Sequence, residues 1–312
     1  MSERLKVMFA RFPGGGMDRA EVTDWLVRSV IAAKEDARIN PCILNWRMTD
    51  TPITMSRNRC VADAQKSGVD VLVMVDNDMH PDFYLPDNPY AALKDPTSRP
   101  FFESSFDLLY HRRMASEGPA VIGAPYCGPP PHENVYVFQW QDRETNGPED
   151  GSFFALEGFT REDSTKMSGI TEVAALPTGL IMFDMRAFAF TDPPYFYYEW
   201  EDETESAKAS TEDVTLTRDL SLNSVPQFCN WDAWAGHWKQ KCVGRPVLLS
   251  PKTINRRFRS RILAELNIMS PNEELIFVGR NGKASNGHVT DYVQTSRIAG
   301  PAPKPEEVTI CE

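Results

Sequence analysis

The sequence predicts an α/β fold in which helices flank a mostly parallel sheet. Over residues 1–125, short apolar segments alternate with segments whose apolar residues recur at helical spacing. This alternation is typical of parallel sheets with helices on their faces. In addition, the almost continuously apolar segment Val69–Val75 has the composition of a strand that is buried on both faces.

The elements of the first half follow from these patterns. The helix predicted at residues 18–33 carries Val22, Trp25 and Leu26 on one side, and Gly68 lies where a later helix is expected to be capped. The predicted strands are 5–10, 41–46, 69–75 and 120–124. The predicted helices are 18–33, 54–67 and 104–116.

The second half is less regular. Residues 134–141 alternate between apolar and polar, which predicts an antiparallel strand. Residues 142–169 are polar and rich in turn formers, which predicts a loop or an insertion. The remaining predicted elements are strands at 171–175, 179–183 and 225–229, a short helix at 185–188 and a helix at 212–222.

Composition and charge exclude several classes of protein. The chain has 312 residues, 41% of them apolar, and a net charge of −11, so it can bury a core as one large α/β domain with extensions or as two domains. No apolar run reaches the ~18 residues of a membrane span, and the N-terminal segment lacks a secretory signal, so we expect a cytoplasmic protein. The six cysteines form no C-x-x-C pair, which argues for reduced thiols. The acidic balance argues against general affinity for nucleic acid.

The strongest chemical signal is Asp76-Asn77-Asp78, directly after the apolar strand at 69–75. In open α/β sheets, ligands bind outside the carboxyl ends of the strands. Two carboxylates at this spacing can share Mg²⁺ or Mn²⁺, which typically takes one or two carboxylates together with phosphate oxygens of a substrate. The alternative is that these residues only form the turn after the strand.

The surrounding segment, SRNRCVADAQKSGVDVLVMVDNDMHP, resembles the GT-A glycosyltransferases, in particular the family-2-like branch of bacteria and their phages. The shared pattern is R-N, a helix, G-x-D and then a hydrophobic strand with D-x-D-M. The resemblance implies a Rossmann-like GT-A domain with an antiparallel acceptor-side portion. It also implies that the D-x-D motif holds Mn²⁺ or Mg²⁺ against the diphosphate of a nucleotide sugar, with Asp78 as the direct ligand. Asp76 would then contact the ribose, or the metal through water.

Three further matches follow in the order of that family. Thr178 and Gly179, between two predicted strands, resemble the acceptor-side turn that approaches the sugar, although an ordinary turn between core segments is the alternative. Glu212 and Asp213 resemble the family's E-D motif, which implies that Asp213 is the general base, although carboxylates also cap helix N-termini well. His237 stands where relatives have a further metal ligand, although a lone histidine is more often structural.

The resemblance also implies a set of donor-binding residues. Arg11 and Phe12, at the end of the first strand, stand where relatives hold the nucleotide, and the glycines after them do not form a Walker sequence. Arg57 is a candidate for the diphosphate or for sugar hydroxyls, or else caps its own helix or forms a salt bridge within it. The remaining donor-side candidates are Asn58, Asp76, Asn77 and Lys239.

Two features depart from the ordinary family pattern. The aromatic and acidic stretch at 195–205 contains Trp200 and can form an acceptor groove, a partly buried lid or an oligomer contact. The other feature is the basic cluster with Arg256, Arg257 and Arg259. It can clamp the donor diphosphate, bind a phosphate-bearing acceptor or pair with the acidic surface.

Together these patterns predict a metal-dependent glycosyltransferase of the hexosyltransferase type that uses a nucleoside-diphosphate sugar, such as a UDP-sugar, and a hydroxyl acceptor. Candidate acceptors are a hydroxymethylpyrimidine in DNA, a protein and a glycan, and a phage-encoded enzyme would act in the host cytoplasm. The predicted GT-A domain covers residues 1–250, with a nucleotide-sugar half at 1–125 and an acceptor half at 126–250. A basic extension with a flexible tail covers 251–312. Two alternatives stay open, a nucleotidyltransferase and a non-catalytic nucleotide-sugar-binding protein.

Overall fold

The computed structural model describes most of the chain up to residue 243 and three strands beyond it. The described ranges are residues 4–13, 19–45, 52–91, 93–128, 134–140, 156–200, 208–238 and 242–243, with the strands between residues 274 and 298. The chain forms two compact units, one of residues 1–127 and 135–245 and the other of residues 128–134 and 246–312. All the candidate site residues that the structure describes belong to the first unit.

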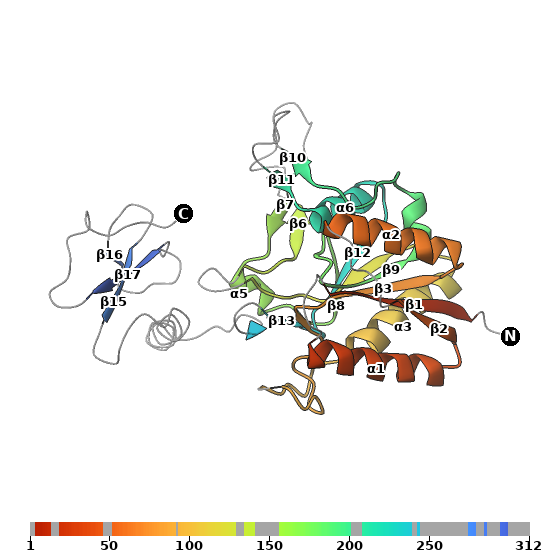
Figure 1. Ribbon diagram of the computed structural model, residues 1–312, viewed down its shortest axis with the longest axis horizontal. Helices are drawn as coiled ribbons and strands as arrows, with labels where there is room; N and C mark the ends of the chain where they lie inside the picture. The colour runs from red at the N-terminus through yellow and green to blue at the C-terminus, as the bar shows by residue number, and fades with distance from the viewer. Residues whose placement is uncertain are drawn as a thin grey trace. The chain divides into compact units, whose positions relative to one another are not determined.

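A seven-stranded sheet forms the centre of the first unit (Figure 1). Five of its strands run in one direction, while β9 and β8 run antiparallel to their neighbours. This arrangement confirms the predicted α/β class with a mostly parallel sheet. The order across the sheet is β2 (Ile39–Asn45), β1 (Leu5–Phe12), β3 (Val71–Asp76), β9 (Leu180–Asp184), β5 (Val121–Gly123), β12 (Gln227–Asn230) and β8 (Ile170–Val173).

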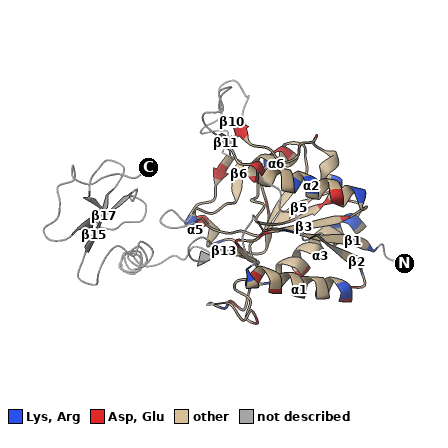
Figure 2. Ribbon diagram, viewed as in Figure 1, with Lys and Arg blue, Asp and Glu red and all other residues tan. Residues whose placement is uncertain are grey.

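Helices cover both faces of this sheet. In Figure 1, α1 (Ala20–Glu35) and α3 (Phe101–Met114) lie below the sheet, and α2 (Ile53–Lys66) and α6 (Glu212–Leu222) lie above it. Charged residues gather on the helices and at strand ends, whereas the middle of the sheet is mostly uncharged (Figure 2). The sheet is therefore a buried layer between two helical layers, as the apolar strands of the sequence require.

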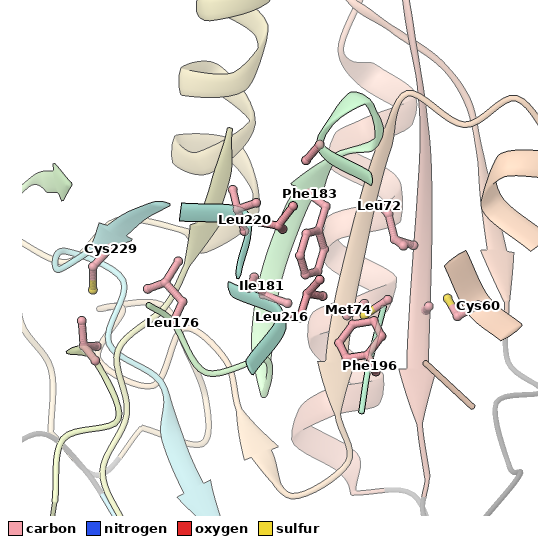
Figure 3. Packing of buried hydrophobic residues seen from close by; sticks show 14 of the residues in the cluster. Cys60, Leu72, Met74, Leu176, Ile181, Phe183, Phe196, Leu216, Leu220 and Cys229 are labelled. Carbon is pink, nitrogen blue, oxygen red and sulfur yellow. The ribbon is translucent and has the colours of Figure 1, made fainter. Parts of the chain in front are cut away.

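Alternate residues of the strands build two separate cores. Leu72 and Met74 point to the face covered by α2 and α6, where they pack with Cys60 and Leu216 (Figure 3). Their neighbours Val71 and Val73 point to the opposite face and pack in the core that includes residues of α1 and α3. Because successive side chains of a strand point to opposite faces, a continuously apolar strand serves both cores at once.

The register of the strands places several chain ends at one edge of the sheet. Phe12, the last residue of β1, pairs with Asp76, the last residue of β3. The antiparallel strand β9 starts beside this point, since Leu180 pairs with Val75 and the Gly179 carbonyl accepts a hydrogen bond from the Asp76 amide at 2.8 Å. The carboxyl ends of β1 and β3 and the amino end of β9 therefore meet.

Several short elements complete the description. The strand β13 (Gly236–Trp238) pairs with β4 (Met79–His80), so that His237 lies opposite Met79. The other short elements of the first unit are β6 (Phe138–Trp140), β7 (Leu156–Gly158), α5 (Arg161–Ser164), the 3-10 helix η1 (Met185–Ala189), β10 (Glu199–Trp200), β11 (Lys208–Ser210) and β14 (Cys242–Val243). The second unit contains an antiparallel sheet of β15 (Glu274–Val278), β16 (Ala284–Ser285) and β17 (Gln294–Ile298).

The structure confirms the predicted strands and helices of the central layers, with ends that differ by at most three residues. Of the two alternatives predicted for 142–169, a plain loop is wrong in the described part, because β7 and α5 lie there, and an insertion stays a prediction. The glycines at 14–16, the arginine cluster at 256–261 and the tail at 300–312 lie outside the described residues. None of the helices in the described part of the chain is long and apolar enough to cross a membrane.

Candidate active site

The candidate site lies at the edge of the sheet where β1 and β3 end and β9 begins. An arginine of α2 supplies one of its side chains, and four further segments supply the others: the end of β3, the N-terminus of α6, the strand β13 and the residues that follow β5. Three of these bring Asp76, Asp78, Glu212, Asp213 and His237, all predicted from the sequence, into one region. The fourth brings a tyrosine that the sequence analysis did not single out.

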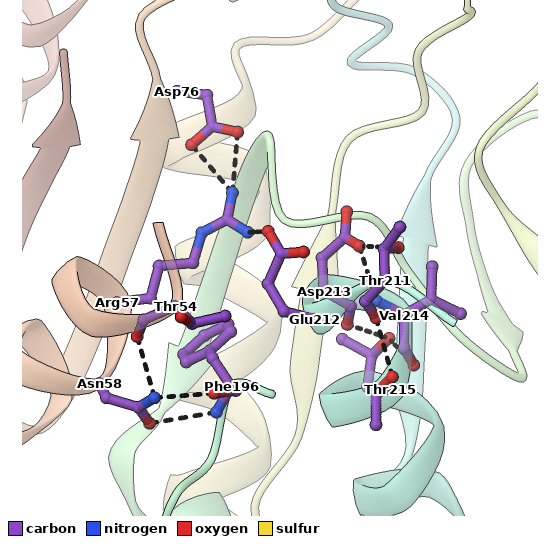
Figure 4. Close-up of polar contacts among 11 residues, drawn as sticks. Thr54, Arg57, Asn58, Asp76, Phe196, Thr211, Glu212, Asp213, Val214 and Thr215 are labelled. Carbon is purple, nitrogen blue, oxygen red and sulfur yellow. Dashed lines mark hydrogen bonds and ion pairs between the residues drawn. The ribbon is translucent and has the colours of Figure 1, made fainter. Parts of the chain in front are cut away.

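Arg57 is the centre of the buried part of this region. Its guanidinium is 3% exposed. One terminal nitrogen, Nη2, donates to both carboxylate oxygens of Asp76 at 3.0 and 2.8 Å, and Nη1 donates to Glu212 Oε1 at 2.7 Å (Figure 4). An arginine of α2 thus ties the end of β3 to the N-terminus of α6.

Aromatic and amide groups hold this arginine in place. The guanidinium carbon of Arg57 lies 5.8 Å from the ring centre of Phe12 and 5.7 Å from that of Phe196. The side chain of the neighbouring Asn58 donates to the Phe196 carbonyl at 2.8 Å and accepts from the Phe196 amide at 3.1 Å. Arg57 and Asn58 therefore fasten the segment around Phe196 to α2, and their contact with a donor stays a prediction.

The charges of this network are strongly coupled. Burial disfavours a charged guanidinium, but the charges of Asp76, Asp213 and Glu212 oppose it and raise the pKa of Arg57 above its ordinary value. Burial also raises the pKa of the Asp76 carboxyl, an effect that Arg57 opposes and Asp78 increases. Burial likewise raises the pKa of Glu212, against the charge of Arg57. Several carboxylates thus surround a single guanidinium. Because negative charge is in excess here, the region favours a further cation.

His237 and Asp78 form the part of the site best suited to hold that cation. Nδ1 of His237 lies 3.0 Å from the carbonyl oxygen of Cys127, and Nε2 lies 3.2 Å from Asp78 Oδ2. A carbonyl oxygen only accepts hydrogen bonds, so we assign the proton to Nδ1. In a neutral imidazole, the Nε2 lone pair then faces a carboxylate oxygen, and two acceptors at this distance need a proton or a metal ion between them.

The geometry of this pair fits a divalent metal ion. Two ligands at adjacent corners of an octahedron, with bonds of ~2.1 Å, stand about 3 Å apart. A hydrogen bond from the other ring nitrogen to a carbonyl is also usual for metal-binding histidines, because it fixes the tautomer and the ring orientation. Within the described ranges, no three His, Cys, Asp or Glu side chains form a metal-binding group. His237 and Asp78 would therefore share the ion with water and substrate oxygens.

Asp213 is held in place by its own helix. It lies in the first turn of α6, partly exposed, and one of its oxygens accepts from the Val214 amide at 2.9 Å and from the Thr211 hydroxyl. Both contacts fix the carboxylate, and the helix N-terminus favours its negative charge. Glu212, by contrast, is buried against Arg57.

Tyr126, which follows β5, is the functional candidate that sequence reasoning missed. It is 6% exposed, and its ring meets the His237 ring edge-on at 5.0 Å between centres. Burial and the charges of Asp213, Asp76 and Asp78 raise the pKa of Tyr126 well above its ordinary value, so its hydroxyl stays protonated. Its place after a parallel strand is the signal that could have identified it.

Thr178 and Gly179, the predicted sugar-side residues, lie beside this tyrosine. The Thr178 side chain is fully buried. A Cβ atom on Gly179 would stand 2.7 Å from the Tyr126 hydroxyl oxygen and 2.9 Å from the Met79 sulfur. Gly179 is therefore required by its protein neighbours, independently of any substrate.

The remaining predicted residues are spread more widely. Arg11 is buried at the end of β1, and the Asn77 amide lies 3.3 Å from the Phe12 carbonyl oxygen. The Asn77 side chain accepts from the Arg19 amide at 3.3 Å, next to the start of α1. Trp200 lies in β10, and its side chain is not described. The residues Lys239, Arg256, Arg257 and Arg259 lie outside the described part of the chain.

Comparison with known proteins finds similarity in structure only. No protein-family model and no curated protein matches the sequence. The viral protein A197 from STIV is 13% identical, and the match covers 79% of this chain and 97% of A197 with a TM-score of 0.45. GalNAc-T7 with UDP, GalNAc and Mn²⁺ is 10% identical and matches 75% of this chain with a TM-score of 0.33, and the chain spans 44% of its length.

A third similar structure is a putative glucose-1-phosphate thymidylyltransferase from Bacillus anthracis in complex with a sucrose. It is 10% identical, and the match covers 73% of this chain and 69% of that protein with a TM-score of 0.30. With TM-scores below 0.5, these similarities assign no activity to the chain. The function is therefore inferred from the site itself.

Proposed function

We propose that this protein is a metal-dependent glycosyltransferase that moves a sugar from a nucleoside-diphosphate sugar, such as a UDP-sugar, to a hydroxyl acceptor. The observation that carries the proposal is the contact of His237 Nε2 with Asp78 at 3.2 Å, at a sheet edge that also holds the carboxylates of α6. A candidate metal-binding pair, from the turn after β3 and from β13, and a candidate base on α6 are the two parts that this reaction needs.

Asp78 and His237 would hold Mn²⁺ or Mg²⁺. When bound, this ion neutralises the negative charge that develops on the departing diphosphate. The Cys127 carbonyl keeps the proton of His237 on Nδ1, so that Nε2 is available as a ligand. Asp76 is already paired with Arg57, so we propose that it contacts the donor ribose, or reaches the metal through water.

Asp213 is the proposed general base. As the acceptor oxygen attacks the anomeric carbon, the bond from that carbon to the diphosphate oxygen breaks, and the acceptor proton passes to the Asp213 carboxylate. Thr211 and the Val214 amide hold this carboxylate in place. If the base acts from the side opposite the diphosphate, the configuration of the sugar is inverted.

The donor nucleotide is proposed to lie along the end of β1. Arg11, Phe12 and Asn77 occupy this end of the sheet, and Arg19 lies over the Trp238 ring at 4.7 Å from its centre. Lys239, the next residue in the sequence after Trp238, is proposed as a further contact of the diphosphate. This placement puts the nucleotide next to the Asp78–His237 pair.

The acceptor is proposed to bear a hydroxyl group near α6, as a hydroxymethylpyrimidine of DNA, a protein or a glycan does. An acceptor with phosphates would need the arginine cluster, since the net charge is −11. For such an acceptor, the affinity should fall as the salt concentration increases. The double substitution Arg257→Ala and Arg259→Ala should make this dependence on salt less steep. Affinity that does not depend on salt would exclude a nucleic acid.

A thermal-shift panel tests the proposed function. UDP, UDP-glucose, UDP-galactose and UDP-N-acetylglucosamine are each added with and without Mn²⁺, and at least one UDP-sugar is expected to raise the melting temperature only with the metal. Asp78→Ala and His237→Ala should abolish this shift. Asp87→Ala, at an exposed carboxylate outside the site, should retain it. Equal shifts with and without Mn²⁺, or no shift with any nucleotide, would overturn the proposal.

A further inference from the structure

Tyr126 interacts with both the proposed metal ligands and the proposed base of the candidate site. Its ring packs edge-on against His237 of the proposed metal pair. Its phenol also lies within the fields of Asp213, Asp76 and Asp78, which belong to α6, to β3 and to the turn after β3. Tyr126 thus contacts a proposed metal ligand and interacts electrostatically with the proposed base.

The position of this side chain is fixed from several directions. The ring of Tyr136 meets it edge-on at 5.5 Å and meets the His237 ring at 6.3 Å, so the three rings form one cluster. The Tyr136 amide donates to the Tyr126 carbonyl at 3.1 Å, and the Ala235 amide donates to the Pro125 carbonyl at 3.0 Å. A side chain held in this way can present its hydroxyl to a ligand without loss of rotamer freedom.

The glycine beside it leaves room for that hydroxyl. The Tyr126 oxygen stands 2.7 Å from where a Cβ of Gly179 would be, so any other residue at 179 would displace it. Gly179 precedes β9, and its carbonyl accepts from the Asp76 amide. The hydroxyl is therefore seated on the same turn that holds the end of β3.

The proposed reaction determines what occupies the space near this hydroxyl. The diphosphate would lie at the ion that Asp78 and His237 would hold, and Asp213 would face the acceptor hydroxyl. Because the anomeric carbon must lie between the leaving oxygen and the attacking oxygen, the group between these two positions is the transferred sugar.

On this basis, which rests on the proposed function, we propose that Tyr126 selects the donor sugar by donating a hydrogen bond from its hydroxyl to a hydroxyl oxygen of the transferred sugar. A site built to hydrogen-bond a substrate hydroxyl rejects analogues that lack it more strongly than an apolar pocket does. Tyr126 is thus a specificity-determining residue. It serves neither as the base nor as a metal ligand.

Titration calorimetry with Mn²⁺ tests this role. The probes are UDP and the UDP-sugar that the thermal-shift panel selects. Tyr126→Phe should bind UDP as the wild type does and the UDP-sugar about 5- to 10-fold more weakly. Tyr110→Phe removes a hydroxyl from an equally buried tyrosine of α3 and should change neither affinity.

A second measurement uses deoxy analogues of that UDP-sugar. For the wild type, one deoxy analogue should bind about 5- to 10-fold more weakly than the complete UDP-sugar. For Tyr126→Phe, that analogue and the complete UDP-sugar should bind with equal affinity. If Tyr126→Phe discriminates all the analogues as the wild type does, or if it weakens UDP and UDP-sugar equally, the proposal about Tyr126 is wrong. Failure of the wild type to bind any UDP-sugar would instead overturn the proposed function.

Discussion

Arg57 Nη1 donates to Glu212 Oε1 at 2.7 Å, across 155 residues of sequence. The same guanidinium also binds Asp76, so one buried arginine sets the distance between the end of β3 and the N-terminus of α6. One buried ion-paired unit therefore joins the D-x-D segment to the first turn of α6, where the proposed base also lies. A substitution of Arg57 should therefore affect both the end of β3 and the N-terminus of α6.

We expect Arg57→Met to destabilise the fold by about 3 kcal/mol, because it leaves two largely buried carboxylates without their partner. Arg57→Lys keeps the charge but loses the fork that reaches both partners, so its loss should be smaller. Urea unfolding followed by circular dichroism measures both. Lys166→Met breaks an exposed ion pair with Glu162 and should cost no more than about 0.5 kcal/mol. Equal effects of Arg57→Met and Lys166→Met would show that the network is not stabilising.

Local patterns were sufficient to predict the central layers. The strand β3 is predictable because apolar residues fill both of its faces, and its end is marked by the change to Asp76-Asn77-Asp78. The helix α6 was predicted with its observed bounds, since Thr211 precedes it and Glu212 and Asp213 occupy its first turn. In both cases the signal lies within a few residues.

Contacts between distant segments could not be predicted in this way. The strands β4 and β13 have two and three residues, too few to show a period, although their pairing brings His237 to the D-x-D segment. The pairing of Arg57 with Glu212 depends on the packing of α2 and α6 over the same face of the sheet. The place of Tyr126 depends likewise on how β5, β9 and β13 come together.

Asp213→Asn should lower kcat by about 10²- to 10⁴-fold, the usual contribution of a general base. The affinity for the UDP-sugar should stay within twofold of the wild type, because the residue is assigned to the acceptor proton. Steady-state kinetics and calorimetry on the same preparations separate the two effects. Glu212→Gln is the matched comparison and should mainly reduce stability, since this carboxylate faces Arg57. A larger loss of kcat in Glu212→Gln than in Asp213→Asn would mean that Glu212 is the base and that Asp213 is not.

Asp82 makes the stability of the fold depend on pH. It is 4% exposed and accepts from the Phe101 amide at 2.8 Å, at the start of α3. Burial raises the pKa of Asp82 to about 7, against the Phe101 amide and Arg28, whereas its ordinary value is 3.8. Between these values the folded chain keeps a proton that the unfolded chain has lost, so this group lowers the stability as pH rises from 4 to 7.

The substitution Asp82→Asn tests this effect, because the amide oxygen can still accept from Phe101 and no longer titrates. The free energy of unfolding is measured in urea at pH 4.5 and pH 7.5 for both proteins. Relative to Asp82→Asn, the wild type should lose about 2 to 4 kcal/mol between the two pH values. A constant difference between the two proteins would show that Asp82 titrates normally.

Gly179→Ala should damage both the fold and the site, while Gly118→Ala should not. A Cβ at 179 would stand 2.7 Å from the Tyr126 hydroxyl oxygen and 2.9 Å from the Met79 sulfur, so these two side chains must shift. Tyr126 packs against His237, and Met79 directly follows Asp78, so the shift would reach the proposed metal ligands. We expect a loss of stability of about 1 to 3 kcal/mol, as for overpacked cores, together with weaker Mn²⁺-dependent binding of the UDP-sugar. At Gly118, no atom lies within 4 Å of an added Cβ, and alanine should be neutral or stabilise by up to about 1 kcal/mol. Thermal melts with and without the ligand measure both effects, and a Gly179→Ala protein that melts and binds like Gly118→Ala would mean that the turn before β9 adapts without cost.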